Sequence, residues 1–269
     1  MRAPTLRGKL TQLSNLPVSK WMAFTRGWVS RERTGAVPCA LPYAKHLLQI
    51  PIREFYDSYW FFCESEVGTR ELTFFLKHLS AGDVFYDIGG FRGAYGAAAK
   101  AALGDSVKVH LFEPIQENWQ AIEAISKLNQ FAGFEIVRLA VGCDLAVKGV
   151  FNEKDRMFRD GDASVSSAAR EIPATSLDAY VTNSKQIPSI IKIDVDGFEL
   201  QVLSSGLSTL SQFKPRLWME LHPNYLSAQG RNWEEAIEML KSIGYRTIIF
   251  YQDFSLETRD VSFHVWCEA

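Results

Sequence analysis

The sequence lacks any apolar run approaching the ~20 residues that a membrane-spanning helix needs, and it contains no internal repeat or low-complexity tract. Its four cysteines form no C-x-x-C pair, which disfavours a disulfide framework or a cysteine zinc site and favours a reducing, cytoplasmic setting. With 29 basic against 31 acidic residues, the chain has no excess of positive charge, so we expect no nucleic-acid partner. The 269-residue chain suits one α/β domain with an N-terminal extension.

The sequence VFYDIGGFRGAYG over residues 84–96 predicts a buried strand, a tight glycine turn and the start of an alanine-rich helix. The turn has neither the G-x-G-x-x-G spacing of a dinucleotide site nor the Gly-Lys-Ser/Thr of a phosphate loop. It has Asp87, Gly89 and Gly93 instead, and a carboxylate at the strand's end suits a ligand with a cationic amino group. This pattern favours S-adenosylmethionine as the cofactor, and a purely structural turn is the alternative.

Two later strand ends extend the predicted cofactor site. Glu113, followed by Pro114, ends a second strand-like run, and an acid roughly 20 residues beyond the glycine turn suits a ribose diol. A solvated surface acid is the plainer interpretation of Glu113. Residues 134–141 predict the third strand, whose end at Ala140 would lie beside the adenine.

Four sequence blocks, taken together and in this order, resemble the FkbM-type methyltransferases. They are DIGGFRGAY at residues 87–95, FEP at 112–114, IIKIDVDGFE at 190–199 and MELHP at 219–223. The resemblance covers about residues 66–269. It implies a class I fold that uses S-adenosylmethionine, and O-methylation of a hydroxyl on a sugar, polyketide or related natural product. The acceptor would therefore be a small molecule or a glycan.

The chain departs from the family pattern at one point in the first block. The family commonly has Asp-x-Gly-Ala-Asn there, whereas this chain has Gly90 and Phe91. A polar ligand contact at position 91 is therefore not expected. A catalytically inactive protein that keeps the fold to bind cofactor or to regulate is the competing function, because a fold does not guarantee an activity. The missing G-x-G-x-x-G disfavours a nicotinamide-dependent dehydrogenase.

Strands alternate with helices along the chain, and two consecutive strands at 247–251 and 262–267 close it. This order predicts the seven-stranded, mostly parallel sheet of a class I (Rossmann-like) methyltransferase, with helices on both faces. We expect the methyltransferase domain over residues 66–269 and an N-terminal extension over 1–65. The aromatic-rich residues 41–62 are expected to form packed core, with a substrate-facing lid as the alternative.

Residues 1–31 form a basic arm with six Arg and Lys residues and no acid. Three interpretations stay open for this arm. It could be an organelle-import signal, a helix that contacts an anionic membrane surface without crossing it, or an arm that packs on the domain or mediates a homodimer.

Catalytic candidates follow the fourth and fifth strands, because ligands of doubly wound sheets bind beyond the carboxyl ends of the strands. Asp194 ends a buried run, and a buried carboxylate needs a partner or a function. Asp196 and Glu199 have the spacing of a helix-capping pair, which is the favoured interpretation for them. Glu220 and His222 complete the group, although His222 could equally be a structural loop histidine.

Methyl transfer to an alcohol requires that the hydroxyl lose its proton as it attacks. A histidine or carboxylate base can remove the proton, or a divalent cation can lower the pKa of the hydroxyl. Asp194 and Glu220, with His222, could bind magnesium through oxygen and nitrogen ligands. We favour metal-free base catalysis and leave the requirement for a metal open.

Overall fold

The computed structural model describes residues 35–143, 146–152, 157–159, 169–251 and 262–269. The basic arm over residues 1–31, with its three interpretations, lies outside this range. No helix in the described ranges is long and apolar enough to cross a membrane.

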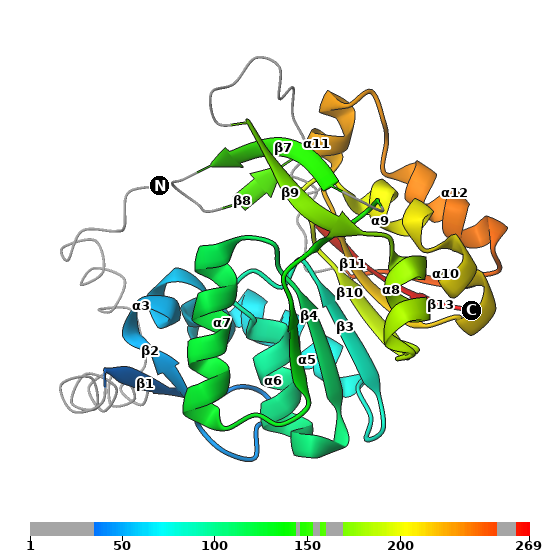
Figure 1. The fold of residues 1–269 in the computed structure, drawn as a ribbon. Helices are drawn as coiled ribbons and strands as arrows, with labels where there is room; N and C mark the ends of the chain where they lie inside the picture. The colour runs from blue at the N-terminus through cyan, green and yellow to red at the C-terminus, as the bar shows by residue number, and fades with distance from the viewer. Residues whose placement is uncertain (1–34, 144–145, 153–156, 160–168, 252–261) are drawn as a thin grey trace.

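A seven-stranded sheet forms the centre of the molecule (Figure 1). Its strands, in spatial order, are β12 (Thr247–Phe250), β13 (Phe263–Glu268), β11 (Arg216–Leu221), β10 (Ile190–Ile193), β3 (Val84–Ile88), β4 (Lys108–Phe112) and β5 (Phe134–Val137). β13 runs antiparallel to both neighbours, and every other neighbouring pair is parallel. The predicted seven-stranded, mostly parallel sheet with a closing antiparallel pair is therefore confirmed.

Alternating side chains of the buried strands pack into two hydrophobic cores, one on each face of the sheet. In β3, Phe85 joins one core and Tyr86 the other, as the two-residue period of a strand requires. The first face is covered by α5 (Glu66–Lys77), α6 (Ala94–Leu103) and α7 (Gln116–Asn129). The second is covered by α8 (Leu177–Ser184), α9 (Glu199–Ser205), α10 (Leu207–Phe213), α11 (Pro223–Ala228) and α12 (Glu234–Ser242). Figure 1 shows the two layers on opposite sides of the strands.

The segment before α5 packs into the first core rather than standing apart from it. It contains β1 (Ala36–Cys39), β2 (Leu48–Pro51), α3 (Ile52–Glu54), the π-helical turn η1 (Phe55–Tyr59) and α4 (Trp60–Glu64). Phe55 and Tyr59 are buried, as expected of the aromatic-rich residues, whereas Trp60 and Phe61 are exposed. Residues 47–52 alternate in the way that is typical of a strand, and Leu48–Pro51 form β2. The domain boundary at residue 65 stays a prediction.

The third predicted strand, residues 134–141, is partly wrong because the chain leaves the central sheet after Val137. Ala140–Val141 (β6) instead joins a separate small sheet with β9 (Ala169–Thr175), β7 (Ala146–Asn152) and β8 (Met157–Arg159). Residues 152–169 have no periodic pattern, which is typical of a surface loop; they contain the short strand β8, and most of them fall outside the described residues. The 3-10 turn η2 (Gly104–Ser106) follows α6.

Candidate active site

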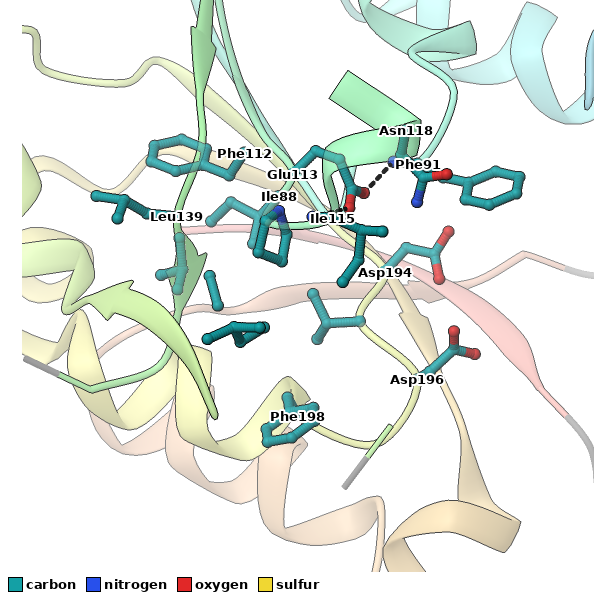
Figure 2. A pocket seen from close by; sticks show the side chains of 16 residues that line it. Ile88, Phe91, Phe112, Glu113, Ile115, Asn118, Leu139, Asp194, Asp196 and Phe198 are labelled. Carbon is teal, nitrogen blue, oxygen red and sulfur yellow. Dashed lines mark hydrogen bonds between the residues drawn. The ribbon is translucent and has the colours of Figure 1, made fainter. Parts of the chain in front are cut away.

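A pocket opens at the carboxyl ends of β3, β4 and β10, where the small sheet meets the central one. Its apolar wall includes Phe112, Leu139, Ile172 and Phe198, and its acidic residues are Glu113, Asp194 and Asp196. Figure 2 shows Asp194 and Asp196 on the opposite side of the pocket from Phe112 and Leu139. The pocket therefore offers an apolar end and an acidic end to one ligand.

The glycine turn after β3 supplies one edge of the pocket. Gly89 has a φ of +75°, and a Cβ added there would lie 1.8 Å from the backbone oxygen of Asp194, so this position requires glycine. Gly93, with a φ of +77°, is the N-cap of α6 and does not line the pocket. Phe91, between them, lines the pocket and has a backbone φ of +48°, which residues other than glycine rarely adopt.

Glu113 holds the glycine turn from within the pocket. Its carboxylate accepts hydrogen bonds from the backbone N–H of Phe91 (2.9 Å) and of Ile115 (2.8 Å), the first of which is drawn in Figure 2. Burial raises the pKa of Glu113 to about 7, although these hydrogen bonds oppose the shift. Pro114 and Ala140 also line the pocket. Four of the predicted cofactor residues, namely Gly89, Glu113, Pro114 and Ala140, are thus brought together.

Asp87 lies beneath the turn rather than in the pocket, since its side chain faces α6. One carboxylate oxygen accepts a hydrogen bond from the backbone N–H of Gly96 (3.2 Å), and the other lies 3.4 Å from Nζ of Lys192. Burial raises the pKa of Asp87, against the lowering effect of Lys192. Direct contact of Asp87 with a cofactor stays a prediction, and the structure gives this carboxylate two partners inside the protein.

Lys192 connects the turn to the predicted catalytic group, and sequence reasoning missed it. Its buried ammonium lies 3.4 Å from Asp87 and 3.3 Å from Asp194, and it donates a hydrogen bond to the carbonyl of Gly89 (2.9 Å). Burial lowers the pKa of Lys192, but the carboxylates of Asp194 and Asp87 outweigh it and raise that pKa overall. A signal was present, because a lysine within the run Ile-Ile-Lys-Ile must be buried and paired.

His222 lies at the centre of four carboxylates. Its Nδ1 is 2.7 Å from Oε1 of Glu199, and its Nε2 is 3.5 Å from Asp196, 3.8 Å from Glu220 and 4.0 Å from Asp194. The structure therefore brings the three predicted catalytic residues, Asp194, Glu220 and His222, into one cluster. Asp194 also lines the pocket, which places this cluster beside it.

The environment of His222 favours the charged imidazolium. Burial alone would lower the pKa of His222, but the hydrogen bond to Glu199 and the nearby carboxylates raise it to about 9. The interpretation of Asp196 and Glu199 as a helix-capping pair is wrong, because the N-cap of α9 is Phe198 and this helix has no side-chain capping hydrogen bond. Glu199 is completely buried, and it accepts hydrogen bonds from His222 and from the backbone N–H of Gly197.

A second buried polar group adjoins Glu220 on the α5 side of the sheet, and the sequence interpretation missed it too. His264 lies 3.5 Å from Glu220 and 3.4 Å from Glu71 of α5. Tyr95 donates to Glu71 and accepts from the indole N–H of Trp218 (3.2 Å). The signal in the sequence was an acid, Glu71, next to the apolar stripe of α5.

Chemically, the cluster can accept a proton or bind a cation. Ligand atoms of Asp194, Glu220 and His222 lie within 4.8 Å of one another, which is close enough for a metal site. His222 would have to lose its proton before Nε2 could bind a metal, because only neutral imidazole is a ligand.

Residues 83–247 match the family model described as the methyltransferase FkbM domain. The fold resembles the FkbM methyltransferase from Methylobacillus flagellatus KT, at 16% identity, with a TM-score of 0.50 over 71% of this chain and 44% of that one. The chain therefore spans less than half of that protein's length.

Two other similar structures are methyltransferases as well. One is precorrin-6y C5,15-methyltransferase from Geobacter metallireducens GS-15, with 10% identity and a TM-score of 0.44 over 77% and 90% of the two chains. The other is an rRNA methylase from Streptococcus thermophilus, with 15% identity and a TM-score of 0.44 over 74% and 94%. No curated protein matches the chain. Because the family model spans more than half of its length, the chain belongs to the FkbM methyltransferase family.

Proposed function

We propose that this protein transfers the methyl group of S-adenosylmethionine to a hydroxyl of a small molecule or glycan, such as a sugar or polyketide. The observation that carries the proposal is the junction of the pocket and the cluster at Asp194. This residue lines the pocket, and its carboxylate lies 4.0 Å from Nε2 of His222. In this proposal the pocket takes the cofactor, the cluster accepts the proton, and both include the carboxylate of Asp194.

The residues of the pocket fit S-adenosylmethionine chemically. The apolar wall, with Phe112, Leu139 and Ile172, suits a flat adenine, and Glu113 can accept hydrogen bonds from two ribose hydroxyls. The acidic end suits the ammonium and sulfonium charges. The bound cofactor supplies an electrophilic methyl group.

The protein's own residues would position the acceptor and take its proton. Asp194 lines the pocket and His222 lies beside it, so we assign both residues to the acceptor hydroxyl. Glu220 lies 3.8 Å from His222 and favours its charged form once the proton has been taken. His222 must first be neutral to act as a base, which at a pKa of about 9 requires alkaline conditions or a change in its surroundings.

The metal-assisted alternative uses the same residues. A magnesium ion held by Asp194, Glu220 and His222 would lower the pKa of the acceptor hydroxyl directly. The two routes separate in one assay, because activity in a chelator would leave only the base route. Loss of activity in chelator with recovery on adding magnesium would establish the metal route.

Binding and turnover are tested separately. Calorimetric titration with S-adenosylmethionine and S-adenosylhomocysteine tests the cofactor site, and NAD serves as the control ligand. Incubation with methyl-labelled S-adenosylmethionine and an extract of the source cell then tests transfer and reveals the acceptor. Absence of binding would refute the proposal. Binding without transfer to any acceptor would instead favour the inactive, regulatory alternative.

A further inference from the structure

Arg92 lies in the glycine turn, and its side chain is buried between this turn and the N-terminal segment. The side chain is 2% exposed, and its guanidinium pairs with the carboxylate of Glu54 in α3, which is also buried. The guanidinium carbon lies 5.5 Å from the ring centre of Phe91, within the distance of a cation–π contact. Phe91 lines the pocket. Glu54 therefore holds the guanidinium of Arg92, which in turn contacts a residue of the pocket.

A second residue of the N-terminal segment holds the backbone of the same turn. The hydroxyl of Tyr59, which is completely buried in η1, donates a hydrogen bond of 3.1 Å to the backbone carbonyl of Arg92. The carboxylate of Glu113 binds the backbone N–H of Phe91 on the other side of that residue. The turn is therefore anchored both from within the pocket and from the N-terminal segment.

The turn needs such anchors because Phe91 has a φ of +48°. Residues other than glycine adopt this conformation at a cost in energy, and it persists only where the surroundings hold it. Glu54 and Tyr59 are not pocket residues, and both precede the family domain at 83–247.

We propose that Glu54 and Tyr59 are positioning residues that hold Phe91 and Arg92 in the shape that binds the cofactor. The segment Ile52–Tyr59 then belongs functionally to the cofactor site, although that site would otherwise begin at β3. The proposal rests on the proposed use of S-adenosylmethionine.

The test is calorimetric titration of the full chain with S-adenosylhomocysteine. Tyr59→Phe removes only the hydroxyl, and it should weaken binding about 2- to 10-fold, the range for one neutral hydrogen bond. Glu54→Gln should weaken binding by at least as much, because it releases the guanidinium from its ion pair.

Tyr245→Phe is the matched control. Tyr245 is also buried, and its hydroxyl donates a hydrogen bond of 2.7 Å to the carbonyl of Pro215, but it does not line the pocket. Tyr245→Phe should lower the melting temperature about as much as Tyr59→Phe does, and it should leave the affinity for S-adenosylhomocysteine unchanged. If Tyr59→Phe and Glu54→Gln bind the ligand as the wild type does, the proposal is refuted.

Hydrogen exchange gives a second measurement that needs no ligand. The peptide covering residues 88–96 should exchange faster in Tyr59→Phe than in the wild type or in Tyr245→Phe. Unchanged exchange in this peptide would overturn the positioning role. If the wild-type protein fails to bind S-adenosylhomocysteine, the proposed function is refuted instead. Hydrogen exchange would still decide whether Tyr59 holds the turn.

Discussion

The raised pKa of His222 should make the stability of the protein depend on pH in a way that can be assigned to this one side chain. The charged groups that face it are Glu199 from α9, Asp194 and Asp196 after β10, and Glu220 from β11. The hydrogen bond to Glu199 and the charges of Asp194, Glu199 and Glu220 raise the pKa of His222 from 6.5 to about 9 despite burial. The folded state therefore binds the proton more tightly than the unfolded state does.

The sign and size of the effect follow from linkage. A raised folded-state pKa stabilises the protein fully below the unfolded value of 6.5, and this stability is lost as pH rises through about 9. At 1.36 kcal/mol per pKa unit, the full contribution is about 3 kcal/mol, of which about 2 kcal/mol should disappear between roughly pH 7 and pH 9.5.

The assay is equilibrium unfolding in urea across this pH range, with a chelator present, for the wild type and His222→Gln. The difference in unfolding free energy between them should shrink as pH rises. His110→Gln is the control, because burial lowers the pKa of His110 and this histidine is already neutral over most of the range. Wild-type and His222→Gln curves that run parallel would refute the reasoning.

Three further substitutions test the site. Glu113→Gln should weaken binding of S-adenosylhomocysteine by about 1.5–3 kcal/mol in calorimetry, the range for hydrogen bonds to a charged group; unchanged affinity would remove Glu113 from the site. Lys192→Met should destabilise the protein by about 3–5 kcal/mol in urea, because it leaves the carboxylate of Asp87 buried without its cation; a loss below 1 kcal/mol would show that this carboxylate is already neutral. Asp194→Asn should lower the rate of methyl transfer by a larger factor than it weakens binding of S-adenosylmethionine, because it removes a charge at the acidic end of the pocket as well as a group assigned to the acceptor; full activity would contradict its assignment to the acceptor.

The fold was predictable because its signals are local. Residues 84–96 contain a complete strand, turn and helix start, and the closing strands are separate apolar runs near the end of the chain. Helix starts were less certain, because Ser65 and Thr69 are both residue types that cap helices, and α5 begins after Ser65. The path after Val137 could not be predicted, because residues 134–141 form an unbroken strand-like pattern and only tertiary packing divides them between two sheets.

The site was predictable only as far as residue types and strand ends allow. Asp194, Glu220 and His222 were found because the carboxyl ends of parallel strands meet at one edge. The role of Glu199 was not found, because an Asp-x-x-Glu sequence looks the same whether its glutamate belongs to a helix cap or faces a histidine in the interior. The pair of Glu54 and Arg92 joins residues that are far apart in sequence, and no local pattern reports such a contact.

If the proposed cofactor binds in this pocket, the acidic character of the site should link its binding to the proton on His222. The field that raises the pKa of His222 also favours a cationic ligand, and the two cations compete for the same carboxylates. If the methyl group is delivered beside Asp194, binding of the sulfonium must lower the pKa of His222, and at mildly alkaline pH it releases a proton. That release would also produce the neutral imidazole that base catalysis needs.

Calorimetry in buffers of different ionisation enthalpy measures this proton release directly. S-adenosylmethionine should release more protons at pH 8 than S-adenosylhomocysteine, which lacks the sulfonium charge. In His222→Gln the two ligands should release equal numbers, because the titrating group is gone. Equal release by both ligands in the wild type would show that the sulfonium does not approach His222, and the assignment of this histidine to the acceptor hydroxyl would then be untenable.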